Sequence, residues 1–397
     1  MVELSVKNEA AELQKSPARP HRPWWQHGLE LAIFLPLAIV GLEALFAATG
    51  IGEQEFLNPD MELGCLHIPG KLVTWRLEGY SRDYLSRAGL RDVDHEITAA
   101  PNTYRIALLG DSATEGLQVP LTDTFSRKLE ESLNAKAQAA GSQKRFEVIN
   151  FGCSSYSTGQ EMLTYEKYIR AYKPDLVMLM YTRGDTIENS IDQAHLQMVE
   201  PRPYFYLDGA NQLQEDRSLI LANQDKFAPN PLMNFLRAKS RIYGVYNQTI
   251  FSLSLTDKIY TRFARFFGGI GDKLKGKKPL SAPAYPPQDP FKVTAAILDR
   301  LNKEVRADGG KFVLISFPDI TDHDKTYVQD QQLITNAAKA GGYDLINPSA
   351  YFRAQPDPGS QYLQVHLSKS GHASLAKALE TYLDEKGLTV GATTSSK

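Results

Sequence analysis

From residue 104 onward, short runs of apolar, β-type residues alternate with longer stretches whose apolar residues recur at helical spacing. This alternation is typical of a parallel sheet that carries helices on both faces. We therefore expect an α/β domain whose ligands bind at the carboxyl ends of its strands. The expected strands are 105–109, 146–150, 175–181, 312–317 and 343–346, and the expected helices are 122–137, 158–172, 292–307, 329–340 and 371–386.

The composition is that of a globular chain. Of its 397 residues, 42% are hydrophobic and 23% are charged, which excludes extensive disorder and low-complexity architecture. The 44 basic and 46 acidic side chains give a formal net charge of -2, without the basic excess of a nucleic-acid-binding protein. The two cysteines, Cys65 and Cys153, allow at most one disulfide and exclude a cysteine-rich zinc site. Cys153 follows an expected strand, and we interpret it as a small core residue.

An apolar run at residues 31–51 is long enough to cross a bilayer. At about 1.5 Å of rise per residue it covers roughly 30 Å, and Trp24 and Trp25 stand where interfacial aromatic residues belong. Two other interpretations stay open. Glu43 is the only ionisable residue of the run and favours a buried core helix, and a cleaved signal peptide would also be apolar. We expect an uncleaved transmembrane helix at 27–51.

The charges beside this run predict its orientation. Basic residues precede it and acidic residues follow it, so the positive-inside rule places the N-terminus in the cytoplasm and the rest of the chain on the far, periplasmic side. Residues 1–26 would form a cytoplasmic tail, and 52–103, rich in turn formers, an irregular juxtamembrane segment. The main domain would occupy 104–387 with an insertion at about 190–290, and 388–397 would be a flexible tail.

The expected insertion mixes aromatic and basic residues at 235–268. That mixture suits an interfacial surface or a lid over an acyl-binding groove. An ordinary amphipathic helix packed on the core is the alternative.

Ser112 stands between the first expected strand and a helical pattern, in the run GDSATEG at residues 110–116. A serine there is exposed at the edge of the sheet, and the free N–H groups of a helix N-terminus favour an oxyanion beside it. The alternative is a serine that merely caps the helix.

Four sequence blocks occur together across roughly residues 80–387. They are GDSATEG at 110–116, VINFGCSSY at 148–156, PDLVMLMYTRGD at 174–185 and HLSKSGH at 366–372. In order and spacing they resemble the blocks of the SGNH (GDSL-type) hydrolase superfamily. The upstream segment SRAGLRD at 86–92 resembles a segment of its membrane-anchored bacterial members. The resemblance implies a flavodoxin-like three-layer α/β/α fold.

The resemblance also implies roles for two residues. Ser112 would be the nucleophile and His366 the general base in hydrolysis of an ester. The superfamily usually has a carboxylate three residues before the histidine, but Leu363 stands there. We therefore expect main-chain carbonyls near Leu363 to orient the imidazole of His366, with Asp357 as the alternative acid.

The oxyanion site departs from the superfamily as well. The glycine of the second block is replaced by Ser155, whose backbone N–H can still donate. The asparagine of the third block is replaced by Gly184, so its side-chain donor is missing. Arg183 or Asn189 would have to supply a donor instead.

The sequence thus predicts a membrane-anchored serine esterase that hydrolyses an ester of a cell-envelope glycan or lipid. No cofactor, metal ion or nucleic acid is expected; the expected partners are the acylated substrate and the membrane, through one helix. An O-acyltransferase of extracellular polysaccharide and a catalytically inactive glycan-binding or scaffold protein are the alternatives.

The orientation can be tested with a reporter fused to the C-terminus. A reporter enzyme that is active only outside the cytoplasm should be active in this fusion. The reason is that the positively charged flank precedes the span and keeps the N-terminus in the cytoplasm. Activity of a reporter that works only in the cytoplasm would contradict the orientation.

Overall fold

The structure, a computed structural model, describes residues 24–52, 56–190, 201–227, 230–247, 249, 285–320 and 325–389. Most of the aromatic and basic stretch at 235–268 lies outside these residues, as do both termini of the chain. The chain divides into two compact units, Met1–Ile51 and Gly52–Lys397.

The first unit contains the helix α2 (Trp24–Thr49). Within its segment Trp25–Thr49, the most apolar window of 18 residues has a mean hydropathy of 2.3, and none of that window is buried. Length and composition make it a candidate membrane span, although a signal sequence has the same properties. The helix begins at Trp24, slightly before the expected start at residue 27, and continues through Pro36.

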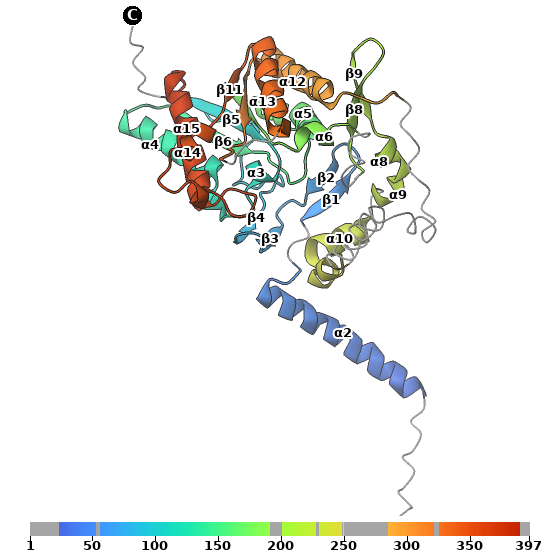
Figure 1. Ribbon diagram of the computed structural model, residues 1–397. Coiled ribbons are helices and arrows are strands. Elements are labelled where there is room, and N and C mark those ends of the chain that lie inside the picture. Colours follow the sequence, from blue (N-terminus) through green and yellow to red (C-terminus); the bar gives the residue numbers. More distant parts are fainter. Residues whose placement is uncertain are drawn as a thin grey trace, which may run out of the picture. The chain divides into compact units, whose positions relative to one another are not determined.

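The second unit is built on a five-stranded parallel sheet (Figure 1). Its strands lie in the order β11-β10-β7-β5-β6. When the strands are numbered along the chain and the sheet is read from the β6 edge, this order is 2-1-3-4-5. This is the order of flavodoxin-like doubly wound sheets, so the expected α/β/α fold is confirmed. All five expected strands are present, as β5 (Thr103–Leu109), β6 (Arg145–Asn150), β7 (Leu176–Tyr181), β10 (Lys311–Ser316) and β11 (Asp344–Ile346).

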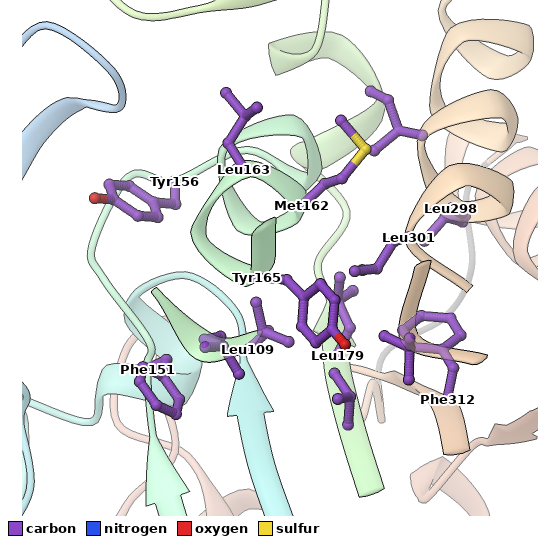
Figure 2. Close-up of a cluster of buried hydrophobic side chains, with 14 of the residues drawn as sticks. Leu109, Phe151, Tyr156, Met162, Leu163, Tyr165, Leu179, Leu298, Leu301 and Phe312 are labelled. Carbon is purple, nitrogen blue, oxygen red and sulfur yellow. The ribbon is translucent and has the colours of Figure 1, made fainter. Parts of the chain in front are cut away.

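Alternate residues of the strands pack against opposite layers of helices, because successive side chains of a strand point to opposite faces. Ala107 and Leu109 of β5 face a core shared with α5 (Thr158–Lys167), α12 (Pro290–Ala307) and α13 (Lys325–Gly341). Figure 2 shows Leu109 in this core. Ile106 and Leu108 face the other core, with α4 (Phe125–Ala139), α14 (Ser349–Arg353) and α15 (Lys369–Glu385).

Residues 56–92 are more regular than the sequence predicts. They form two antiparallel hairpins, one of β1 (Leu57–Asp60) with β2 (Gly64–His67), the other of β3 (Leu72–Trp75) with β4 (Ser81–Tyr84). Strands of four residues are too short for a clear alternating pattern. Their order comes from packing, since Phe56, Val73, Leu85 and Leu117 form a small core of their own.

The described part of the expected insertion also contains regular structure. It holds the hairpin of β8 (Tyr204–Leu207) and β9 (Leu213–Asp216). The helices α8 (Ser218–Ala222), α9 (Gln224–Phe227) and α10 (Pro231–Lys239) follow.

His372, in the first turns of α15, is buried between helices. Its ring stacks on Phe125, and its Nδ1 accepts a hydrogen bond from the Phe125 N–H at 3.2 Å. Burial, helped by the positive charge of Arg91, lowers the pKa of His372 to about 3. The ring is therefore neutral in the folded protein at pH values where the unfolded chain protonates it. His372 thus packs α15 against Phe125 of α4.

We expect the free energy of unfolding to decrease as the pH falls from about 6.5 towards 3, because the unfolded state then binds one more proton. The slope from His372 alone reaches about 1.4 kcal/mol per pH unit. His372→Gln keeps an acceptor for Phe125 and should flatten this dependence in urea unfolding of the full chain in detergent. Above about pH 7, where neither state protonates the ring, both proteins should have the same slope. If the wild type and His372→Gln have the same slope below about pH 6, which is about half a unit under the pKa of a free histidine, the pH dependence does not come from His372.

Candidate active site

Ser112 is the first residue of α3 (Ser112–Glu115), directly beyond the carboxyl end of β5. The helix is capped by Asp111, whose carboxylate accepts a hydrogen bond from the Ala113 N–H at 2.9 Å. The Ser112 hydroxyl is therefore not used as the cap, which removes that interpretation. Its Oγ lies 2.8 Å from Nε2 of His366, so the structure brings together two expected site residues that are far apart in sequence.

Glu78 is a carboxylate partner of His366 that the sequence did not reveal. Its Oε2 lies 2.5 Å from Nδ1 of His366, and the side chains of Glu78 and His366 are 11% and 20% exposed. The other oxygen, Oε1, accepts hydrogen bonds from three successive backbone N–H groups, those of Gln364, Val365 and His366, at 2.6, 2.7 and 3.0 Å. A single carboxylate thus holds both the imidazole and the loop that carries it.

This arrangement corrects the expectation that main-chain carbonyls orient His366. The partner of Nδ1 is a carboxylate, not a carbonyl near Leu363. Asp357 is not the acid either, since its carboxylate accepts a hydrogen bond from the Ser360 N–H at 3.3 Å. The Leu363 N–H donates to the carbonyl of His366 at 2.8 Å, which closes the loop as a tight turn.

The carboxylate of Glu78 is ionised at neutral pH. Burial alone would raise its pKa, but the N–H groups of His366 and Val365 and the imidazole outweigh burial and lower the pKa to about 2. A charged acceptor at Nδ1 fixes the tautomer that leaves Nε2 free to accept a proton, and it stabilises the imidazolium that results. A carbonyl would do only the first of these.

Glu78 reaches His366 from the tip of the β3–β4 hairpin. The neighbouring Gly79 has φ 69°, and a Cβ at this position would lie 2.2 Å from the carbonyl oxygen of Gln118. The Tyr80 N–H donates to that same carbonyl at 3.0 Å. Only glycine fits the turn, because it has no Cβ and tolerates positive φ. No local motif marks Glu78 as a partner of His366, which lies in a segment near the other end of the chain.

The loop after β6 packs directly on the helix of Ser112. A Cβ on Gly152 would lie 2.5 Å from the backbone N of Glu115, so this close approach requires glycine. Further along the loop, Ser155 has φ 66°, an uncommon value for a residue with a side chain. Its carbonyl accepts a hydrogen bond from Nη1 of Arg202 at 2.9 Å, which helps to hold this conformation.

The third block supplies less to the site than the superfamily pattern would. Gly184 precedes the short helix α6 (Asp185–Glu188), and Arg183 is exposed in the same turn. Asn189 cannot replace the missing asparagine, because its amide is used elsewhere. Its Oδ1 accepts from the Gly159 N–H at 2.8 Å, and its Nδ2 donates to Oγ1 of Thr294 at 2.9 Å.

Glu115, at the end of α3, ties the serine helix to two other segments. Its Oε1 lies 2.9 Å from Nε2 of His67, and its Oε2 accepts from the Ser154 N–H at 2.8 Å. Burial opposes ionisation of this carboxyl group, but His67 and Ser154 hold its pKa below the ordinary value. Nδ1 of His67 lies 2.8 Å from the carbonyl of Gly89, which can only accept, so that nitrogen carries a proton.

Among the described residues, no three His, Cys, Asp or Glu side chains are grouped so that they could hold a metal ion. The chemistry that these residues can perform is proton transfer between Ser112 and His366, with Glu78 as the charged acceptor behind the imidazole.

No protein-family model matches the chain, and no curated protein matches it. Similar solved structures include TesA, with 10% identity over 70% of this chain and 97% of that one and a TM-score of 0.38. The lipase/acylhydrolase from Enterococcus faecalis has 12% identity over 72% of this chain and 97% of that one, with a TM-score of 0.39. An acetylxylan esterase from Geobacillus stearothermophilus has 15% identity over 72% and 94%, with a TM-score of 0.37.

The strand order and the places of the motif blocks are observations on this chain itself. The first three blocks stand at the carboxyl ends of β5, β6 and β7, and the fourth leads into α15 beside Ser112. The 2-1-3-4-5 order gives this chain a flavodoxin-like α/β/α fold, and the blocks that resemble those of the SGNH (GDSL-type) hydrolases gather at the carboxyl edge of its sheet.

Proposed function

We propose that this chain is a membrane-anchored serine esterase that hydrolyses an ester of a cell-envelope lipid or glycan. The observation that carries the proposal is the continuous series of contacts from Ser112 through His366 to Glu78, called the triad below. A hydroxyl, an imidazole and a charged carboxylate in this order form the arrangement of nucleophilic acyl transfer.

In the proposed reaction, Nε2 of His366 accepts the hydroxyl proton as Oγ of Ser112 attacks the ester carbonyl. The tetrahedral intermediate collapses to an acyl-enzyme, and His366 returns the proton to the leaving alcohol. Water then attacks the acyl group with His366 again as base, which releases the acid and restores the Ser112 hydroxyl. Glu78 stabilises the imidazolium in both halves.

The backbone N–H groups of Ser112 and Ser155 are the proposed oxyanion donors. The left-handed conformation of Ser155 supports this role, because a strained backbone at a site of this kind often serves to aim a donor. Arg183 is the proposed third donor, in place of the side chain that Gly184 lacks. A missing donor costs about 3–4 kcal/mol of barrier stabilisation in other enzymes.

The complete triad favours an active enzyme over an inactive scaffold protein. Acyl transfer to a glycan would pass through the same acyl-enzyme and differ only in the acceptor. The imidazole of His366 is partly exposed, so water can reach the acyl group, which favours hydrolysis. The candidate span α2 and the flanking charges support a membrane-anchored domain on the extracytoplasmic side.

Exposed apolar side chains beside the triad favour a lipid over a glycan. Leu77, next to Glu78, is 72% exposed, and Val365, next to His366, is 71% exposed. Tyr80 and Leu363 extend this apolar rim, and a Cβ on Gly79 would lie 3.0 Å from Cδ1 of Leu363, so the two segments adjoin. An alkyl chain bound along the rim would remove this surface from water, which favours binding by about 25 cal/mol per Å².

The triad can be tested with a serine-directed phosphonate and with hydrolysis of p-nitrophenyl acetate. Ser112→Ala should abolish both labelling and hydrolysis. Glu78→Gln should lower kcat on the order of 10⁴-fold, the scale for neutralising a triad carboxylate. Asp357→Asn is the control and should change kcat less than about twofold, since Asp357 does not reach His366. Loss of activity in Asp357→Asn with a fully active Glu78→Gln would overturn the assignment of the acid.

The apolar rim can be tested with p-nitrophenyl esters of increasing chain length. The ratio of kcat/KM for the decanoate to kcat/KM for the acetate should exceed one and should fall about tenfold in Leu77→Ser and Val365→Ser. Val328→Ser, which changes an apolar side chain that is 57% exposed on α13, should not alter the ratio. An equal ratio in all four proteins would exclude the rim as a chain-binding surface.

A further inference from the structure

The two cysteines of the chain lie far apart in sequence but meet in the fold. Cys65 belongs to β2 and is half-buried, whereas Cys153 lies in the loop after β6 and is 4% exposed. Both are packed in the same hydrophobic core, where burial and the nearby Cys65 thiol raise the pKa of Cys153. Both thiols are free in the structure. Since these are the only cysteines of the chain, no other internal pairing competes with this one.

Three further contacts hold the segments of the two cysteines together. The hydroxyl of Tyr156 donates to the carbonyl of Cys65 at 2.6 Å. The side chain of Gln160 donates to the carbonyl of Leu63 at 2.6 Å.

The third contact is the buried carboxylate of Glu115, which joins His67 on one side to Ser154 on the other. These two residues stand two and one positions away from Cys65 and Cys153, respectively. These contacts hold the backbone segments around the two cysteines next to each other in the folded protein.

We propose that Cys65 and Cys153 form an intramolecular disulfide that staples the β1–β2 hairpin to the loop carrying Ser155. This inference rests on the extracytoplasmic location in the proposed function, because disulfides form and persist in oxidising compartments. It does not depend on the esterase activity.

The bond forms by thiol–disulfide exchange with the disulfide of a small-molecule or protein oxidant. The thiolate of Cys65 attacks one sulfur of the oxidant and releases its first thiol; the thiolate of Cys153 then attacks the sulfur of Cys65 and releases the second. Two protein thiols and one oxidant disulfide become one protein disulfide and two oxidant thiols, which take up both protons. Burial raises the pKa of Cys153, so exchange is fastest during folding, before the loop closes over this thiol.

The staple has a structural consequence for the site. The closed loop of chain from Cys65 to Cys153 contains both Glu78 and Ser112. Cross-linking a long loop stabilises a protein mainly by restricting its unfolded state. The bond therefore favours the folded state of the unit that contains the hairpin presenting Glu78.

The first experiment counts thiols in the full chain, purified in detergent from a bacterial host that exports it. The protein is unfolded without reductant, alkylated with N-ethylmaleimide, and analysed by mass spectrometry. We expect no alkylated cysteine before reduction, two after it, and one peptide pair linked through Cys65 and Cys153. Two alkylated cysteines before reduction, or a disulfide-linked dimer in a non-reducing gel, would overturn the proposal.

The second experiment measures the stability that the bond provides. Dithiothreitol should lower the Tm of the wild-type chain by several degrees and should not change the Tm of the Cys65→Ala/Cys153→Ala variant. An equal response of both proteins would contradict the staple. Hydrolysis of p-nitrophenyl acetate by the same samples separates the two ideas. A linked but inactive wild type would contradict only the esterase, and an active wild type with free thiols would contradict only the disulfide.

Discussion

The carboxylate of Glu78 holds the candidate active site together. One oxygen accepts hydrogen bonds from the N–H groups of three consecutive residues, and the other contacts the imidazole of His366. These partners outweigh the unfavourable burial of the charge and keep the carboxylate ionised. The loop around His366 would otherwise leave three N–H groups without these acceptors, so its conformation and the position of the imidazole both depend on this one side chain.

Because Glu78 comes from a hairpin outside the sheet, the attachment of residues 56–92 to the sheet becomes a condition for the site. The guanidinium of Arg91 is almost fully buried and donates to Asp83 and to the carbonyl of Val119, both at 2.9 Å. The carboxylate of Asp92 accepts from the N–H of Asn150 at 2.8 Å. These buried charges are paired, as their desolvation requires. The upstream hairpins are thus part of the folded unit.

The end of β7 shows how polar groups of the third block are used for structure. The Thr182 hydroxyl lies 2.9 Å from a carboxylate oxygen of Asp111, the cap of the serine helix, and 3.1 Å from one of Asp185. Burial raises the pKa of Asp185, and the nearby Asp111 raises it further. The hydroxyl has one proton to donate, so it donates to one of these carboxyl groups and accepts from the other when that group is protonated. Thr182 therefore links β7 to the helix of Ser112.

The sequence alone determined the fold class and two of the three residues of the proposed triad. Strand runs and helical periods are local patterns, so the parallel sheet could be predicted from them. The four blocks predicted Ser112 and His366 as site residues, because each block lies within a few consecutive residues. Glu78 could not be found in this way. Its role comes from a turn that Gly79 permits and from hydrogen bonds to a loop 288 residues away, and only the tertiary structure brings those groups together. The same reason applies to Cys65 and Cys153, which only the tertiary structure packs into one hydrophobic core.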